Sequence, residues 1–326
     1  MTGKYEHVLG FALEHPWALT ESMRAIVADI IAHRVAGQDT DPAVIAAALV
    51  QRKNLPQPKK GGAVAVIPFY GVVAPRMNLL SDFSGGTTFD QLTAQLHEAV
   101  SNPDVTTIVF DVDSPGGNVA GATEFAREVL KARTVKPIIA VAQYLMASAA
   151  YWPMACATEV VAAPSAMVGA IGVYTIHDDI SEALAKLGVK REVIGAGKFK
   201  TEAVGGGALS TEARAHIQAL VDSTYTRQIT DISKGRGVSV AAVRGGYAEG
   251  RCVDVETALA AGMIDRVGTL ADTLARVMTS APADARAVAR TDATDQERPI
   301  AATSQEHPTD ALWQNGIDAA LLELGL

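Results

Sequence analysis

The sequence predicts an α/β fold in which helices cover a mainly parallel sheet. Between residues 63 and 280, short apolar runs alternate with stretches whose apolar residues recur at helical spacing, a pattern typical of βαβ units with right-handed crossovers. The run Ile108–Phe110 is apolar on both faces, as expected of a strand covered on both sides. With 48% hydrophobic and 20% charged residues, the 326-residue chain has a globular composition.

A helical extension is predicted ahead of this core, in residues 1–55. Thr20 is suited to cap a helix, and Asp41-Pro42 has the N-cap and first-turn pattern of a second helix. Trp17, which precedes the first helix, is expected to be a packing anchor. Prolines, glycines and basic residues in 51–62 then indicate a linker.

The core, taken as one domain over residues 63–280, has a recognisable order of elements. A capping threonine, Thr87 or Thr88, and an amphipathic period predict its first helix. A long apolar stripe predicts a helix from Ser210 to Lys234. The patterns together predict strands at 63–69, 105–112, 137–142 and 159–162, extended pieces at 169–174 and 191–195, helices at 87–102, 119–133, 181–187 and 210–234, a helix that begins at Ser148, and a closing segment over 248–265.

Two further segments are predicted after the core. Residues 281–308 contain mainly Ala, Asp, Arg, Thr and Pro without any aromatic residue, and we expect a disordered tether. Residues 309–326 have apolar side chains at helical spacing and predict a short amphipathic helix that docks on a partner. Its apolar face consists of Trp313, Ile317, Leu321 and Leu324.

Composition and charge exclude several classes of function. The net charge of −8 argues against nucleic acid as a partner, because a binding face needs a concentrated basic stripe. The two cysteines, Cys156 and Cys252, provide neither a disulfide framework nor a metal-ligand spacing. No signal-peptide layout is present, and no apolar stretch reaches the roughly 18 residues of a membrane span. We therefore expect a cytoplasmic protein without membrane, metal or cofactor.

Ser148 is the candidate nucleophile. It stands among alanines where the strand-like run 137–142 should turn into a helix. Such a turn exposes a hydroxyl at the carboxyl edge of a sheet and directs amides of the helix N-terminus, here that of Ala149, to the same point. Serine is also a common helix N-cap, so a purely structural role is the alternative.

The segment Asp113-Ser114-Pro115-Gly116-Gly117 favours the catalytic interpretation. It follows a buried strand and lies one βα unit before Ser148. Glycine has no Cβ, so Gly116 and Gly117 let the backbone approach a substrate with bare N–H groups. Either amide can then stabilise an oxyanion, whereas a plain turn is the alternative for these glycines alone.

Three side chains are candidates for the base that an attacking serine needs. His177 would complete a Ser-His-Asp arrangement, but it lies in a polar cluster that opens a helix, which favours a capping or solvated role. Lys200 lies between Phe199 and Thr201, and burial there would favour the neutral form that a basic lysine requires. On an extended strand, Lys198 and Lys200 would point to opposite faces, so that only one of them reaches the pocket.

Four segments of the core form a combined pattern: Asp113-Ser114-Pro115-Gly116-Gly117, Ala147-Ser148-Ala149-Ala150-Tyr151-Trp152, Gly169-Ala170-Ile171-Gly172-Val173 and Gly197-Lys198-Phe199-Lys200. With these segments, residues 63–280 resemble the signal peptide peptidase A family of serine peptidases, which have the ClpP/crotonase fold. The resemblance implies a serine-type endopeptidase with Ser148 as nucleophile, Lys200 as base and Gly116 or Gly117 as an oxyanion donor.

One position departs from the family pattern, and the extension narrows the branch. The family often has a serine where Ala170 stands, and its hydroxyl helps to orient the lysine amine; Thr201 and Ser165 are candidate substitutes. A helical segment with Pro16-Trp17 ahead of the core is similar to the capsid-associated peptidases of lambda-like phages. That resemblance implies cleavage of scaffold, portal or capsid proteins, after small residues, during head maturation in the host cytoplasm and procapsid.

The resemblance also implies a ring-like homo-oligomer with its active sites facing inward. In such a ring the dyad is completed either within one protomer or by Ser148 and Lys200 of neighbouring protomers. We further expect the enzyme to cut its own tether within 281–308. The alternative functions are a cytoplasmic bacterial protease of the same family and a catalytically weak capsid scaffold component. An acyl-CoA hydratase or isomerase on the same fold would need a carboxylate, which the turn at Ser148 does not contain.

Overall fold

The computed structural model describes residues 17–18, 64–75, 86–204 and 206–280. Apart from the two-residue strand β1 (Trp17–Ala18), the predicted N-terminal extension and linker lie outside the described residues. The predicted tether and C-terminal helix lie outside them as well. No helix in the described part of the chain is long and apolar enough to cross a membrane.

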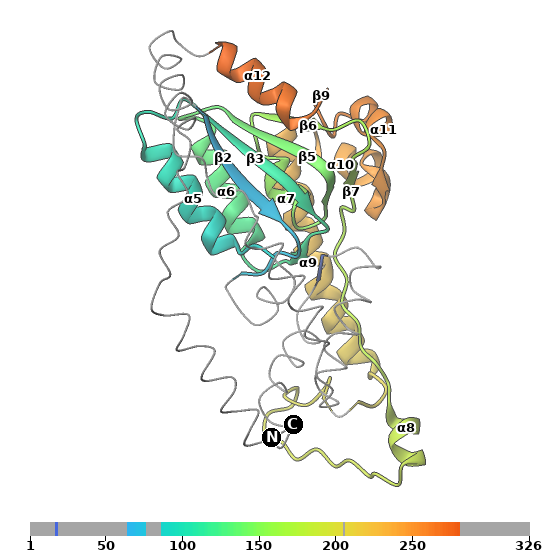
Figure 1. Cartoon of the computed structure of the whole chain (residues 1–326). Coiled ribbons are helices and arrows are strands. Elements are labelled where there is room, and N and C mark those ends of the chain that lie inside the picture. The colour runs from blue at the N-terminus through green and yellow to red at the C-terminus, as the bar shows by residue number, and fades with distance from the viewer. Residues whose placement is uncertain (1–16, 19–63, 76–85, 205, 281–326) are drawn as a thin grey trace, which may run out of the picture. The chain divides into compact units, whose positions relative to one another are not determined.

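A seven-stranded sheet forms the centre of the described core, and this confirms the predicted α/β fold (Figure 1). Its main path is β2–β3–β5–β6–β9, in which all neighbours are parallel. β7 pairs with the last part of β5, and β8 pairs with β7 in antiparallel orientation. The strands are β2 (Val64–Tyr70), β3 (Thr107–Ser114), β5 (Ile138–Ala147), β6 (Glu159–Ala162), β7 (Met167–Gly169), β8 (Cys252–Val253) and β9 (Arg266–Val267).

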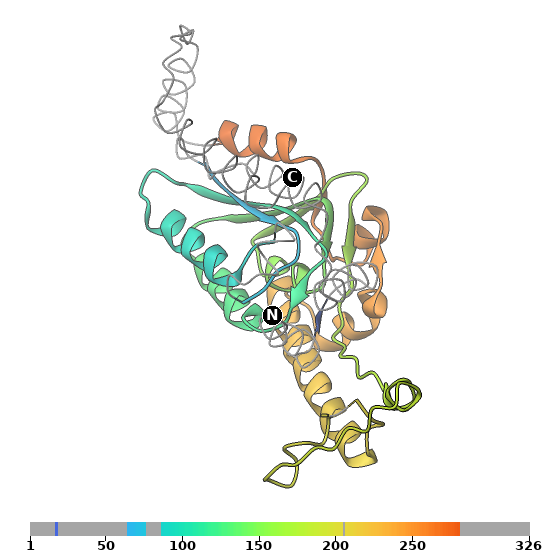
Figure 2. The same ribbon diagram turned by 60° about the horizontal axis from the view of Figure 1, so that its bottom comes forward.

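Helices cover both faces of the sheet, which explains the buried apolar residues on both faces of its central strands. The larger core contains the buried side chains of Leu96, Phe110 and Trp152 from one face and its helices. Helix α12 covers the other face (Figures 1 and 2), and its residues Leu274 and Val277 pack in the smaller core. The helices are α5 (Phe89–Ser101), α6 (Ala122–Ala132), α7 (Tyr151–Met154), α8 (Ser181–Lys186), α9 (Thr211–Arg236), α10 (Val240–Gly246), α11 (Val255–Ala260) and α12 (Leu270–Ser280), with a 3-10 turn at Ala248–Gly250.

Side-chain caps define the helix ends that the sequence predicted. Thr88, rather than Thr87, caps α5: its hydroxyl accepts the N–H of Gln91, and the Gln91 side chain accepts the N–H of Thr88. Ser210 caps α9 through the N–H of Ala213. α9 ends at Gly237, whose φ of 67° is left-handed, so the helix runs slightly beyond the predicted end.

An arm, residues 173–209 with 205 undescribed, leaves the sheet after β7 and carries α8. It runs along the N-terminal half of α9, where Lys198 pairs with Glu212 (Figure 2). Residues 191–195, predicted as an extended piece, join no strand ladder, and consecutive turns follow them at 198–203. The helix predicted to begin at Ser148 is also shorter than expected, because β5 continues to Ala147 and α7 begins only at Tyr151.

Candidate active site

Ser148 lies at a sharp turn between the end of β5 and the start of α7. Its φ of 56° is left-handed, a conformation that non-glycine residues rarely adopt. Its N–H donates to the carbonyl of Gly169 at 2.7 Å, and its carbonyl accepts the N–H of Trp152 at 3.0 Å. The residue is 2% exposed, and no group of the described residues bonds its hydroxyl. This strained strand–turn–helix is the geometry predicted for a nucleophile.

The end of β7 holds the turn in place. Gly169 has a φ of 123°, and a Cβ there would lie 2.6 Å from the carbonyl oxygen of Arg251. The next residue, Ala170, is also left-handed and donates its N–H to the same carbonyl at 2.8 Å. Because Gly169 accepts the N–H of Ser148, Ala170 lies beside the candidate nucleophile. The departure from the family pattern therefore falls at the site itself.

The glycine loop, residues 114–118, is fixed by hydrogen bonds within itself and to the segment that follows β2. The hydroxyl of Ser114 donates to the carbonyl of Gly71 at 2.6 Å and accepts the N–H of Gly116 at 3.2 Å. Val73 donates to the Gly116 carbonyl and accepts the N–H of Asn118, both at 2.9 Å. A Cβ at Gly117 would lie 1.9 Å from the Val73 carbonyl oxygen, so only glycine fits there.

Strand register brings this loop and Ser148 to the same edge of the sheet. Ser114 of β3 is paired with Met146 of β5, and the loop and Ser148 follow these two residues directly. The N–H of Gly116 is bonded by the Ser114 side chain of its own loop, whereas Gly117 pairs with the two-residue strand β1. No described backbone carbonyl outside the strand ladders accepts the N–H of Ala149. Gly117 and Ala149 are therefore the better candidates for oxyanion donors.

None of the three candidate bases contacts Ser148 within the described chain. The ring Nε2 of His177 is 2.6 Å from the carbonyl oxygen of Gly207. Lys198 Nζ pairs with Glu212 at 3.3 Å and lies over the Phe199 ring. Lys200 is exposed, and no described residue accepts a hydrogen bond from its amine.

Two expectations about Lys200 are therefore wrong for the single chain. Residues 198–203 form consecutive turns, with the N–H of Lys200 bonded to the carbonyl of Gly197, instead of an extended strand with alternating faces. Among the described residues, no apolar side chains bury Lys200, which is exposed. Thr201 and Ser165, the candidate substitutes for the missing serine, form no described bond with Lys200 or Ser148.

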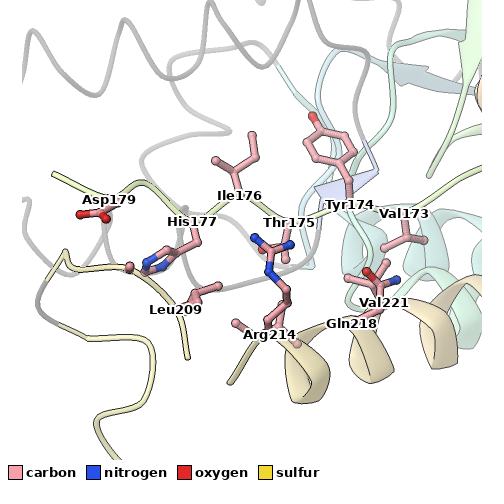
Figure 3. Close-up of a pocket in the computed structure, with 12 residues that line it drawn as sticks. Val173, Tyr174, Thr175, Ile176, His177, Asp179, Leu209, Arg214, Gln218 and Val221 are labelled. Atoms are coloured by element: carbon pink, nitrogen blue, oxygen red, sulfur yellow. The ribbon is translucent and has the colours of Figure 1, made fainter. Parts of the chain in front are cut away.

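A separate cavity of about 660 Å³ lies between the arm and the N-terminal half of α9 (Figure 3). Tyr174, His177 and Asp179 line it from the arm, and Arg214 and Gln218 from α9. Neither Ser148 nor Lys200 lines this cavity. It is thus a feature of the arm and not the cleft of the nucleophile.

Two features near the site were missed by sequence reasoning. Asp111 and Asp113 point to the α12 side of β3, where burial raises the pKa of both carboxyls, and the Tyr70 hydroxyl donates to Asp111. Their alternation within an otherwise apolar strand was the available signal. The second feature is the pairing of β1 with β4 (Gly117–Asn118), the strand of the glycine loop. No local sequence pattern predicts the pairing of β1 with β4.

Comparison with known proteins gives these features a family context. "Capsid assembly protease C" of Escherichia phage lambda is 31% identical over 211 residues, which cover 65% of this chain and 46% of that protein. "Head-tail preconnector protein GP5" of Enterobacteria phage P21 is 28% identical over 223 residues, covering 68% and 44%. "Protease 4" of Salmonella typhi is 28% identical over 217 residues, covering 66% and 34%. The chain spans less than half the length of each of these curated relatives.

Among solved structures, a mutant of ClpP1 from Listeria monocytogenes matches with a TM-score of 0.40 and 14% identity, over 64% of this chain and 92% of that chain. The family model described as peptidase family S49 matches residues 131–284, a range that includes the turn at Ser148 and the whole arm. On these findings, the chain is similar to peptidase family S49 over residues 131–284, just under half of its length.

Proposed function

We propose that this chain is a serine endopeptidase in which Ser148 is the nucleophile and Lys200 of a neighbouring copy is the base. The observation that carries the proposal is the turn at Ser148, whose buried, left-handed backbone presents a hydroxyl that no described residue bonds. A serine that only capped a helix would be bonded to an N–H two or three residues on, as Thr88 is in α5.

The reaction follows from the residues around that hydroxyl. Oγ of Ser148 gives its proton to the neutral Lys200 amine and attacks the peptide carbonyl carbon. The amides of Gly117 and Ala149 stabilise the negative oxygen of the tetrahedral intermediate. When the C–N bond breaks, the lysine returns the proton to the leaving amine, and water then hydrolyses the serine ester by the same route. Only the neutral form of the amine can accept the proton.

The exposed arm supports a base supplied in trans. The nucleophile belongs to the sheet edge, whereas Lys200 stands exposed on the arm and has no described partner. Apolar side chains of the same arm are unusually exposed, including Leu187 at 77% and Ile194 at 92%. Such a surface is typical of an interface between proteins, and the further members are Ile180, Val189, Val193, Phe199 and Val204.

The proposed substrates are proteins of a phage head. The names of the two phage relatives refer to capsid assembly and to the head-tail preconnector, and this context supports scaffold, portal or capsid proteins as targets of the chain. Small side chains before the scissile bond remain the expected specificity. A protease of a bacterial cell is the alternative, for which "Protease 4" is the relevant relative.

A fluorophosphonate probe tests the nucleophile, because only an activated serine reacts with it. Wild-type protein should label and Ser148→Ala should not, while Ser165→Ala, at an exposed turn, should label normally. Turnover of a peptide substrate should be lost in Lys200→Ala and kept in Lys198→Ala and His177→Ala. Unlabelled wild-type protein would overturn the peptidase assignment and favour a non-catalytic head component. Equal loss in Lys200→Ala and His177→Ala would favour a Ser-His mechanism.

A further inference from the structure

The short strand β1 pairs with β4, the strand that contains the proposed oxyanion glycine. The pairing is antiparallel, with Ala18 opposite Gly117 and Trp17 opposite Asn118. Both ribbon views place β1 (dark blue) beside the extended chain that leaves β7 (Figures 1 and 2). A segment far away in the sequence thus lies against the loop that faces Ser148.

The hydrogen bonds of the glycine loop show which backbone groups β1 meets. The carbonyl of Gly116 and the N–H of Asn118 both bond Val73, on one side of the loop. Because successive residues of a strand direct their backbone groups to opposite sides, the N–H and carbonyl of Gly117 face β1. Ala18 is the residue opposite, so its carbonyl stands against the N–H that the proposed reaction assigns to the oxyanion.

A peptide substrate would bind this same edge in the same way. An extended peptide that adds a strand to an exposed edge uses its main chain for affinity. To be cleaved, it must place the carbonyl of the residue before the scissile bond against the oxyanion amides. The carbonyl of Ala18 holds that place in the structure.

We propose that the segment Trp17–Ala18 is a built-in competitor that occupies the substrate strand position at Gly117. The proposal rests on the proposed peptidase function. A two-residue ladder is weak by itself, so substrates can displace it. As part of the same chain, however, the segment competes intramolecularly, and effective concentrations of covalently linked segments reach the order of millimolar. Only peptides that bind tightly, or that are present at high local concentration, then displace the segment and bind at Gly117.

A reversible disulfide across the pair tests the proposal. Since Ala18 and Gly117 form the hydrogen-bonded pair, Trp17 and Asn118 form the adjacent non-hydrogen-bonded pair, with Cα atoms about 4.5 Å apart. That spacing suits a disulfide in the double variant Trp17→Cys with Asn118→Cys. Oxidation should lock β1 onto β4 and abolish fluorophosphonate labelling of Ser148, and reduction of the same protein should restore it.

Controls separate pairing from cysteine chemistry. Each single cysteine variant should label equally under oxidising and reducing conditions. Ala18→Cys with Asn118→Cys places the two thiols on opposite faces of adjacent positions and should cross-link much more slowly. Non-reducing electrophoresis and intact mass report the cross-link independently of any activity.

A second pair of variants removes the competitor instead of locking it. Ala18→Pro has no N–H to offer the Gly117 carbonyl, whereas Ala18→Val keeps it. With Ala18→Pro, KM for a fluorogenic peptide should fall about threefold or more at unchanged kcat, the factor expected if the segment fills the site for most of the time. Ala18→Val should keep the wild-type KM.

The outcomes distinguish this proposal from the proposed function. A double variant that does not cross-link, or that labels fully when cross-linked, overturns the competitor while leaving the peptidase intact. Absence of labelling in the reduced form and in wild-type protein overturns the peptidase and the competitor with it. If wild-type protein is cleaved after Ala18 while the Ser148→Ala variant stays intact, Trp17–Ala18 is a substrate of the enzyme. That result would overturn its role as a persistent competitor.

Discussion

Replacing Ser148 by glycine should stabilise the fold while abolishing the chemistry. The φ of 56° costs a residue with a Cβ about 1–2 kcal/mol, which glycine does not pay. Glycine loses about 0.5–1 kcal/mol through the greater freedom of its unfolded chain. No described residue bonds the Ser148 hydroxyl, so neither Ser148→Gly nor Ser148→Ala loses a described hydrogen bond. The difference leaves Ser148→Gly more stable than Ser148→Ala by about 0.5–1 kcal/mol.

Urea unfolding of the two variants, followed by circular dichroism, measures this difference directly. Ala147→Gly is the matched control, because Ala147 belongs to β5 and is absent from the residues with positive φ. Glycine there should lower the free energy of unfolding. A Ser148→Gly protein less stable than Ser148→Ala would refute the strained turn, and with it the structural argument for the nucleophile.

Three other perturbations address the surroundings of the site. Gly117→Ala places a Cβ 1.9 Å from the Val73 carbonyl oxygen and should destabilise the loop by about 1–3 kcal/mol, measured by urea unfolding; a wild-type midpoint would contradict the close approach. Burial raises the pKa of Asp111, so its folded form holds a proton that the unfolded chain releases, and stability falls as pH rises through that window. Asp111→Asn, whose amide oxygen still accepts the Tyr70 hydroxyl, should reduce this decrease in the free energy of unfolding with pH. At neutral pH the variant should unfold at a higher urea concentration than wild type. The same pH dependence of stability in both proteins would refute the assignment. Burial opposes ionisation of Asp265, but bonds from Arg236 and Val160 hold its pKa below the usual range, so this contribution is lost only as pH falls through the lowered value. Asp265→Asn should lower the free energy of unfolding by about 1.5 kcal/mol at neutral pH. This value is near the lower end for a hydrogen bond to a charged group, because the Asp265 side chain is 40% exposed. An unchanged melting temperature in calorimetry would contradict the prediction.

Most of the fold could be predicted because local and global preferences agree. Strand β6 lies where its apolar run predicted it, and Thr88 and Ser210 cap the helices that they precede. Boundaries shifted where tertiary contacts extend an element. β5 runs on to Ala147 because its last residues pair with β7, a partner that no local pattern indicates. The extended piece expected over 191–195 joins no strand ladder, because an extended segment becomes a strand only when a neighbouring strand is available.

The candidate site was predictable in part for the same reason. Ser148 and Gly117 are each marked by local sequence, and the register of β3 and β5 brings them to one edge. The position of Lys200 depends on the arm, whose apolar residues find no cover within the described chain. The contact of β1 with Gly117 joins segments that are distant in sequence through backbone groups alone, and side-chain patterns carry no information about it.

Mixing two inactive variants tests the central claim most directly. Ser148→Ala retains Lys200, and Lys200→Ala retains Ser148, so a co-expressed assembly contains sites that combine an intact residue from each. With random assembly of a closed ring, roughly a quarter of the sites should be complete, and peptidase activity should return to about that fraction of wild type. Each variant alone should remain inactive, and native mass spectrometry verifies that mixed assemblies form. Mixed assemblies without activity, or a wild-type monomer fully active at high dilution, would contradict a dyad completed between subunits.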